Sequence, residues 1–222
     1  MKVEIPKEIS PELAEETGWH IGDGSMNFYN NKGATRGIYQ LRGHIEDDKQ
    51  HYIDRIKPIF KMLYNVDINL REMPSTRVFG FQIWSDNLVK FKQSLGLKLG
   101  PKVNITIPEV FLKDKELKIA IMKGIFDTDG CIYLQRKNNK LYPRLEIKTI
   151  SLRLAEQLKN LCFELGLRAT MYKNSYKNIG NRKQDYAVVI RGDEMFHRFM
   201  EVIKPANHKH NAKYSLYRKS FK

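Results

Sequence analysis

The strongest constraint on the fold is an internal repeat of a nine-residue segment. Residues 16–24 read ETGWHIGDG and residues 122–130 read MKGIFDTDG. Each copy ends in Asp-Gly and carries a glycine five residues before that aspartate, and the two aspartates, Asp23 and Asp129, are 129 − 23 = 106 positions apart. Because the apolar periodicity that follows each copy also runs in the same order, the repeat predicts two halves of similar structure.

Each half is predicted to run helix–strand–strand–helix–strand–strand–helix, which is an α+β fold. After the first motif we predict strands at 26–30, 38–46, 66–72 and 77–85, and helices at 48–64 and 86–95. After the second we predict strands at 131–136, 144–150, 168–173 and 185–191, helices at 151–165 and 193–203, a polar loop at 174–183 and one more helix within 206–222. Two prolines interrupt regular structure in between. The predicted domains are therefore 1–99 and 113–222, joined by a linker over 100–112.

The motif helices carry small residues on one face. Gly18 and Gly22 are four residues apart, as are Gly124 and Thr128, and residues at that spacing share a helix face. Small side chains there allow two helix backbones to approach closely. A glycine inside a helix costs about 1 kcal/mol relative to alanine, and close packing would offset that cost. We therefore expect the two motif helices to pack against each other.

This packing would bring Asp23 and Asp129 together at one end of the helix pair. A negative charge at a helix C-terminus is unfavourable, and adjacent carboxylates repel unless cations lie between them. Mg²⁺ takes a few carboxylates and keeps water and phosphate oxygens as other ligands, so the repeat predicts a metal site. A lone Asp-Gly is usually only a turn, and its repetition favours the site. Asp127 is interpreted as structural because Ile21 takes its place in the first copy, and the glycine after each motif aspartate is expected to cap its helix with positive φ.

The charge of the chain indicates a polyanionic partner. Lys and Arg number 39 against 25 Asp and Glu, a net charge of +14. Residues 1–130 hold 19 basic and 18 acidic side chains, and residues 131–222 hold 20 and 7, so the surplus lies in the second half. This favours phosphate contacts. The chain lacks a long apolar run and a targeting pattern, so we expect no membrane partner and an intracellular protein. Cys131 and Cys162 form no C-x-x-C pair, which argues against zinc.

The double motif resembles that of the LAGLIDADG homing endonucleases, with glycine third, a small residue seventh and Asp-Gly last. The connector over 95–108 also resembles the link before the second motif in single-chain members. The resemblance implies a monomer with internal pseudo-twofold symmetry, in which each half offers a saddle of four antiparallel strands to double-stranded DNA. It further implies Mg²⁺-dependent hydrolysis of both strands with four-base 3′ overhangs, with Mn²⁺ as a substitute and Ca²⁺ bound without cleavage. The compartment would be the cytoplasm of a prokaryote or archaeon, or an organelle.

The resemblance also implies site residues. Asp23 and Asp129 match the metal-binding aspartates, and the carbonyls of Gly22 and Thr128 are candidate further ligands. Other catalytic candidates are polar residues on the second and third strands of each half: Gln40 or His44, Lys148, and Lys173 with Arg71 as its counterpart. Strand parity argues against Lys173, which continues the core phase of its strand unless the strand bulges.

Strand alternation predicts which side chains face DNA, since neighbours of inward apolar residues point outward. A solvated sheet face would show the same pattern, and the metal-site argument is the reason to prefer base readout. The candidate DNA-binding residues are Asn27, Tyr29, Gln40, Arg42, His44, Asn69, Arg71, Gln82, Trp84, Tyr133, Gln135, Lys137, Arg144, Glu146, Lys148, Arg168, Tyr172, Lys173 and Arg191.

Three other interpretations were weighed. An intein is disfavoured because the chain starts with Met rather than a nucleophilic Cys or Ser, and no splicing domain fits. A maturase or regulator that keeps this fold binds nucleic acid without cleaving it, and such proteins often lose an acid, whereas both aspartates are present here. An unrelated basic enzyme with a coincidental repeat remains the third alternative.

Overall fold

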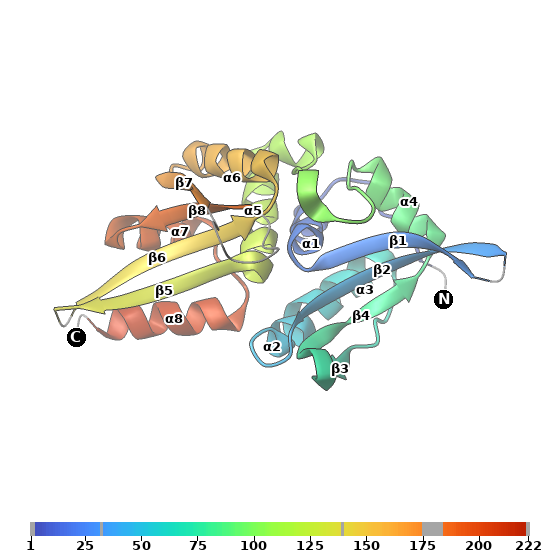
Figure 1. Cartoon of the computed structure of the whole chain (residues 1–222), viewed down its shortest axis with the longest axis horizontal. Coiled ribbons are helices and arrows are strands. Elements are labelled where there is room, and N and C mark those ends of the chain that lie inside the picture. Colours follow the sequence, from blue (N-terminus) through green and yellow to red (C-terminus); the bar gives the residue numbers. More distant parts are fainter. Residues whose placement is uncertain (1–2, 32, 139, 175–183, 221–222) are drawn as a thin grey trace.

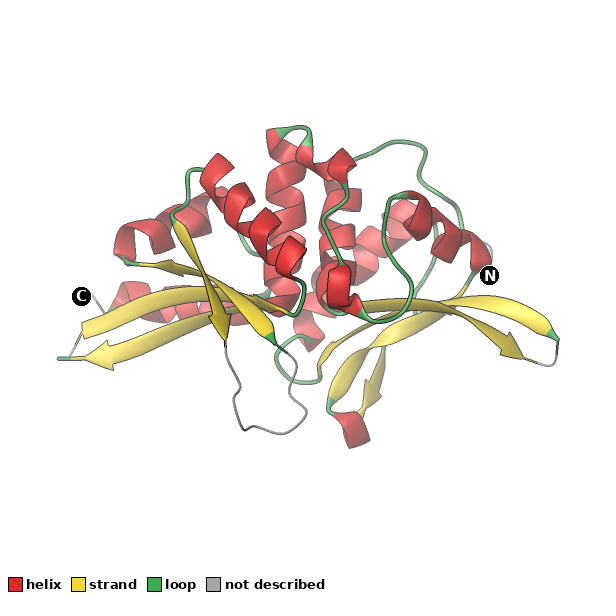
Figure 2. Cartoon of the chain, turned by 45° about the horizontal axis from the view of Figure 1, so that its top comes forward, coloured by secondary structure: helices red, strands yellow, loops and turns green. Residues whose placement is uncertain are grey.

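The computed structural model describes residues 3–31, 33–138, 140–174 and 184–220. The two predicted halves lie side by side, and each contains one four-stranded antiparallel sheet. The long helices lie on one side of both sheets, and the other side of each sheet is open (Figures 1 and 2). The predicted α+β class and the four-stranded antiparallel sheet in each half are confirmed.

The first half has the strand order β1-β2-β4-β3. Its elements are α1 (Pro11–Gly22), β1 (Gly24–Asn31), β2 (Ala34–His44), α2 (Lys49–His51), the π-helical η1 (Tyr52–Ile56), α3 (Lys57–Tyr64), β3 (Arg71–Met73), η2 (Pro74–Thr76), β4 (Val78–Trp84) and α4 (Asp86–Ser94).

The second half has the matching order β5-β6-β8-β7. Two short 3₁₀ turns, η3 (Lys102–Asn104) and η4 (Glu109–Leu112), precede it. Its elements are α5 (Lys115–Asp129), β5 (Gly130–Lys137), β6 (Lys140–Thr149), α6 (Leu152–Glu164), β7 (Ala169–Asn174), β8 (Asp185–Arg191), α7 (Asp193–Val202) and α8 (His208–Lys219).

One predicted strand is largely wrong. Of the strand expected at 66–72 only Arg71 and Glu72 are in a strand, β3, which pairs with the first three residues of β4. Val66 and Ile68 are buried and Asp67 between them is exposed, so the alternation is real. It comes from packing on the core without a partner strand. The loop predicted at 174–183 lies outside the described residues except for Asn174.

The close packing of α1 on α5 is confirmed. A Cβ on Gly18 would stand 2.6 Å from the carbonyl oxygen of Ile121 and 2.8 Å from the Cα of Gly124, and a Cβ on Gly124 would overlap the carbonyl oxygen of Glu15. A Cβ on Gly22 would overlap the side chain of Thr128. The helices therefore touch backbone to backbone, which any larger residue at these glycines would prevent.

Gly130 is the C-cap of α5 as expected, whereas the C-cap of α1 is Asp23, and the positive φ expected at Gly24 and Gly130 is wrong. Gly130 has φ −74° and ψ 146°, and Gly24 does not have positive φ either. Both are the first residue of a strand, and a Cβ there would collide with the helix that has just ended: 2.5 Å from the Cα of His20, and 2.6 Å from the Cγ of Phe126. Glycine is needed because the strand follows the helix directly after α5, and after Asp23 alone at the end of α1.

A buried ionic cluster ties the first half to its motif helix. Glu16 of α1 and Lys92 of α4 form an ion pair in which neither side chain is exposed. Tyr39 donates a hydrogen bond to Glu16 Oε1 (2.8 Å), and Tyr64 donates to Glu16 Oε2 (2.9 Å). Buried charges are tolerated only when paired and hydrogen-bonded. One carboxylate therefore joins α1, β2, α3 and α4.

No helix among the described residues is long and apolar enough to span a membrane.

Candidate metal and DNA site

The two motif aspartates lie at the same end of the packed helices. Asp23 is the C-cap of α1, and Asp129 is the last residue of α5. The Cγ of Asp129 lies 3.3 Å from the place that a Cβ on Gly22 would take. Glycine in the first motif therefore makes room for the carboxylate of the second. The structure therefore brings the carboxylates of Asp23 and Asp129 close together, as predicted.

Two negative charges at this place are unfavourable without a cation, although Asp129 is exposed and Asp23 is only partly buried. Loss of solvent and the neighbouring Asp129 raise the pKa of Asp23 to about 8. Loss of solvent raises the pKa of Asp129 to about 6, although Lys102 and Lys209 act against it. Asp23 Oδ2 is enclosed, and the buried Tyr52 hydroxyl lies close enough to Asp23 for this carboxylate to raise the pKa of the tyrosine. Two carboxylates side by side, one of them open to solvent, suit a metal ion.

Two lysines that the sequence analysis missed lie beside the acids. Lys102 of η3 donates to the carbonyl oxygens of Ile21 (3.0 Å) and Gly22. Lys209 of α8 is 3.5 Å from the carbonyl oxygen of Thr128. The ammonium groups thus contact the carbonyls of Gly22 and Thr128, the two that were expected to bind metal. Each carbonyl therefore already faces a positive charge.

The repeat itself contained the signal for both lysines. Lys102 follows Asp23 by 102 − 23 = 79 positions, and Lys209 follows Asp129 by 209 − 129 = 80 positions. Lys102 lies in the linker and Lys209 in the tail, outside the strands and helices through which the repeat was recognised.

Asp48 is a third buried acid at the site. Its Oδ2 accepts a hydrogen bond from the His44 amide (2.7 Å), and its Oδ1 accepts one from Lys209 Nζ (2.8 Å). A Cβ on Gly43 would stand 2.8 Å from Asp48 Oδ2 and 3.0 Å from Asp23 Oδ2, so this glycine lies between the two acids. In the sequence Asp48 looked like an ordinary helix start, which is why it was missed.

The donor set fits a hard divalent cation. Among the described residues no three His, Cys, Asp or Glu side chains are arranged to hold an ion by themselves. Asp23 and Asp129, with the carbonyls of Gly22 and Thr128, are oxygen donors that leave further positions to water and phosphate. Mg²⁺ is bound in this way in many nucleotide-handling sites.

The strand candidates divide into two groups. Lys148 lines a hollow of about 280 Å³ together with Asp129 and Lys102, so it lies at the site. Gln40 lies in the first sheet, further from the motif aspartates. It is opposite Gln82 of β4, and the two side chains are 3.5 Å apart.

Lys173 does not join the site face. β7 pairs with β8 without a bulge, and Lys173 lies opposite Tyr186 in the same row as Thr149. This is the parity of Ala169 and Met171, which pack against the core. Lys173 is exposed only because its strand ends there, so the structure argues against both its catalytic and its DNA-binding assignment.

The open face of the first sheet carries most of its predicted residues. Arg42, Arg71 and Gln82 line a shallow hollow of about 130 Å³. Tyr29 and Trp84 are among the exposed large hydrophobic residues. Asn27 and His44 are half-buried on this face, and Asn69 is exposed in the segment that precedes β3.

The open face of the second sheet presents two arginine–aromatic stacks. The guanidinium of Arg144 lies 4.5 Å from the ring centre of Tyr133, and that of Arg191 lies 5.0 Å from that of Tyr172. Stacked guanidinium groups are held in place while their edges remain able to donate. Gln135 and Lys137 are exposed towards the end of β5.

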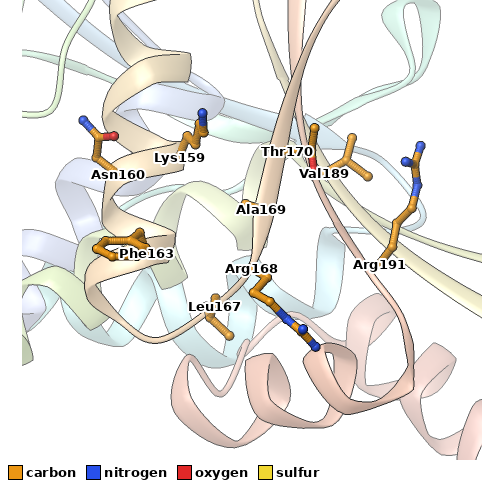
Figure 3. A pocket seen from close by; sticks show the side chains of 9 residues that line it. All are labelled: Lys159, Asn160, Phe163, Leu167, Arg168, Ala169, Thr170, Val189 and Arg191. Carbon is orange, nitrogen blue, oxygen red and sulfur yellow. The ribbon is translucent and has the colours of Figure 1, made fainter.

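Two residues of this sheet are placed differently from the prediction. Glu146 is only 6% exposed and lies 3.0 Å from Lys148 and 3.5 Å from Arg144, so its carboxylate is committed to these cations. Arg168 forms an ion pair with Glu194 of α7 (2.8 Å). Figure 3 shows its side chain extending away from Arg191, in a hollow of about 440 Å³ beside α6. The Arg168 side chain is thus directed towards α7.

Comparison with known proteins agrees with this architecture. The family model for the LAGLIDADG-like domain matches residues 116–204. Among curated proteins, the ribonucleoside-diphosphate reductase NrdEB subunit alpha of Bacillus subtilis is 25% identical over 182 residues, 76% of this chain and 16% of that protein. A DNA polymerase of Methanocaldococcus jannaschii is 28% identical over 176 residues, 75% of this chain and 9% of that protein. The chain thus spans a small fraction of these relatives.

Solved structures match nearly the whole chain. I-DmoI in complex with DNA and Ca has a TM-score of 0.65 at 18% identity, covering 92% of this chain and 97% of that one. The LAGLIDADG meganuclease I-AabMI bound to uncleaved DNA has a TM-score of 0.58 at 11% identity, covering 95% and 91%. The chain therefore has the two-motif LAGLIDADG homing-endonuclease fold, and its residues 116–204 match the model of the LAGLIDADG-like domain.

Proposed function

We propose that this protein is a metal-dependent endonuclease that binds a long, asymmetric double-stranded DNA site and hydrolyses both strands. The observation that carries the proposal is the proximity of Asp23 and Asp129 at the ends of the packed helices α1 and α5. Two lysines flank these acids. A protein that only binds DNA has no need of two adjacent carboxylates whose pKa values are both raised.

The sheets supply the DNA-binding part of the proposal. Arg42, Arg71 and Gln82 on one sheet, and the stacked Arg144 and Arg191 on the other, are side chains that read base edges or bind phosphate. The surplus of 13 positive charges in residues 131–222 adds sequence-independent affinity. The similar proteins I-DmoI and I-AabMI have been solved bound to DNA, the former with Ca or Mn.

Asp23 and Asp129 would hold divalent metal together with the carbonyls of Gly22 and Thr128. Such an ion polarises a phosphate and lowers the pKa of a bound water. The protein's own part is positioning: the glycine faces of α1 and α5 fix both acids. Lys102 and Lys209 present N–H donors at the same place, where they can balance phosphate charge.

One acid from each half supports cleavage of both strands by a single chain. Because Asp23 and Asp129 are related by the repeat, each half would act on one strand of a duplex that lies across both sheets. We propose that the products carry four-base 3′ overhangs and that the protein acts as a monomer. Mg²⁺ is the proposed ion, with Mn²⁺ as a substitute and Ca²⁺ supporting binding without cleavage.

The test is cleavage of sites selected from a randomised duplex library, with Mg²⁺ and then with Ca²⁺. Asp23→Asn and Asp129→Asn should each abolish double-strand cleavage, while DNA affinity stays within about tenfold because most phosphate contacts lie elsewhere. Cleavage retained by either variant would refute the assignment. DNA binding without any cleavage by the unaltered protein would favour the maturase or regulator alternative.

A further inference from the structure

Lys209 is held by a buried hydrogen-bond network that crosses between the halves. Asn207 Nδ2 donates to Asp48 Oδ1 of the first half (2.8 Å) and to the carbonyl oxygen of Asp127 of the second (2.9 Å). The amides of Ala206 and Asn207 each donate to the Asp127 carboxylate at 3.0 Å. Asp127 and Asn207 are 0% exposed and Asp48 is 4% exposed, so the network is closed to solvent.

The network ends on the ammonium group at the site. Asn207 is the N-cap of α8, and its Oδ1 accepts a hydrogen bond from the Lys209 amide (3.1 Å). Lys209 Nζ then bonds to Asp48 Oδ1 (2.8 Å) and lies near the Thr128 carbonyl. Both ends of the Lys209 side chain are therefore fixed, the main chain by Asn207 and the charge by Asp48.

The first half has no counterpart of this arrangement. Ile21 stands where the second motif has Asp127. Asp48 is the N-cap of α2, and the corresponding N-cap of α6 is Ser151, whose hydroxyl donates to the carbonyl oxygen of Ile105 (2.7 Å). Lys102 donates to the main-chain carbonyls of Ile21 and Gly22. The two lysines occupy related positions but are supported by different chemistry.

We propose, resting on the endonuclease function above, that Asp48 is a positioning residue that acts through Lys209 and serves one of the two strand cleavages. Asp48 lies in the first half and Lys209 in the second, so this carboxylate makes one half-site dependent on both halves. Asp48 also acts on the charge of both motif aspartates, but the hydrogen bonds of Lys102 go to the carbonyls of Ile21 and Gly22. Loss of Asp48 should therefore unbalance the two strand cleavages and leave one of them intact.

The experiment follows cleavage of a duplex labelled differently on each strand. In Asp48→Asn the new NH₂ group faces either the His44 amide or both Asn207 Nδ2 and Lys209 Nζ. In both orientations the negative charge that holds Lys209 Nζ is lost, so Lys209 is held less firmly. One strand should be cut about tenfold more slowly while the other stays within about twofold, so that singly nicked DNA accumulates. Equal slowing of both strands would overturn the proposal.

Asp54→Asn is the matched control. Asp54 also bonds to the tail, through the exposed His208 ring at 3.1 Å, one residue from Asn207. This substitution weakens the same contact between the halves without reaching Lys209, so both strand rates should remain unchanged. A strand imbalance in Asp54→Asn as large as that in Asp48→Asn would attribute the effect to docking of the tail and overturn the role of Asp48.

A double-mutant cycle with Lys209→Met separates positioning from folding. Lys209→Met should slow the same strand, and adding Asp48→Asn should have no further effect on it; additive losses would contradict the proposal. If Asp48→Asn fails to fold, Asn207→Ala removes one anchor and should slow the same strand. Absence of any cleavage by the unaltered protein would refute the proposed function, whereas cleavage with an unshifted strand ratio would refute this inference alone.

Discussion

The two halves have the same strand order and the same packing of the motif helix, but they differ in the segments that surround the motif aspartates. Their strand orders correspond one to one, and their motif helices pack face to face. The first half inserts a π-helical turn, η1, where the second has the regular helix α6. Lys102 is brought to the site by the linker, and Lys209 by α8. The comparison teaches that the repeat determines where the acids lie, whereas the unrepeated segments determine what surrounds them.

Substitutions at the contact between α1 and α5 should have the largest effect on the protein. Gly124→Val places side-chain atoms against the Glu15 backbone, and we expect a loss of about 3 kcal/mol or more in the free energy of unfolding. Denaturant unfolding measures it. Ala34→Val is the control, because Ala34 is an exposed residue of β2. Similar losses in the two variants would mean that α1 and α5 are not in backbone contact.

The lysines should be the next most sensitive. Lys102→Met and Lys209→Met should each reduce cleavage about 100-fold, chiefly on one strand, and the two variants should affect opposite strands. The reason is that each ammonium lies at the carbonyl of a different motif. Single-turnover rates on a strand-labelled duplex provide the measurement. If both variants slow the same strand, the site does not divide between the halves as proposed.

The acid pair should make metal-free stability fall as pH rises. The pKa of Asp23 is raised to about 8 and that of Asp129 to about 6. Between the ordinary value of 3.8 and these values the unfolded chain has released protons that the folded protein retains, so increasing pH favours unfolding. For Asp23 the loss between pH 6 and pH 8 should be about 2 kcal/mol.

Thermal unfolding in a chelator across this range tests the pH effect. Asp127, whose pKa burial raises to about 7, contributes to the slope in every variant, so the comparison is made against Asp23→Asn. That variant should have a flatter profile, and added Mg²⁺ should restore the stability of the unaltered protein at pH 8. Identical slopes in the two proteins would show that Asp23 is not a buried acid.

The charge difference between the halves should have the smallest effect. Lys137→Ala removes one exposed cation from the basic second half, and we expect a few-fold loss of DNA affinity with a decrease of about 1 in the slope of log K against log salt. Lys90→Ala, at an exposed residue of α4 in the helix layer, should leave that slope unchanged. An unaltered slope in Lys137→Ala would place this lysine away from phosphate.

The elements that repeat were predictable and those that depend on tertiary partners were not. The periodicity predicted β8 at its observed bounds, and the small residues of the motifs predicted the helix contact. The strand expected at 66–72 failed because burial alternation does not require a hydrogen-bonded neighbour. The positive φ expected at Gly24 and Gly130 failed because a collision with the preceding helix selects glycine as strongly as a turn does.

The candidate site shows the same division. Asp23 and Asp129 were predictable because each copy of the motif specifies one of them. Asp48 and Asn207 were not, since their importance arises from a contact between residues 159 positions apart. Strand alternation also cannot reveal the partners of Glu146 and Arg168. Glu146 lies beside Arg144 and Lys148, and Arg168 pairs with Glu194 of α7.

The cluster around Glu16 limits how such a protein can be recombined. Glu16, Tyr39, Tyr64 and Lys92 all belong to the first half, so a chimera that exchanges the complete second half inherits the cluster whole. Transplanting α1 alone into a relative would leave a carboxylate or an ammonium group unpaired in the interior. The free energy of unfolding would then fall by about 3–5 kcal/mol. Designers of altered specificity should therefore treat the half, rather than the motif helix, as the smallest exchangeable unit.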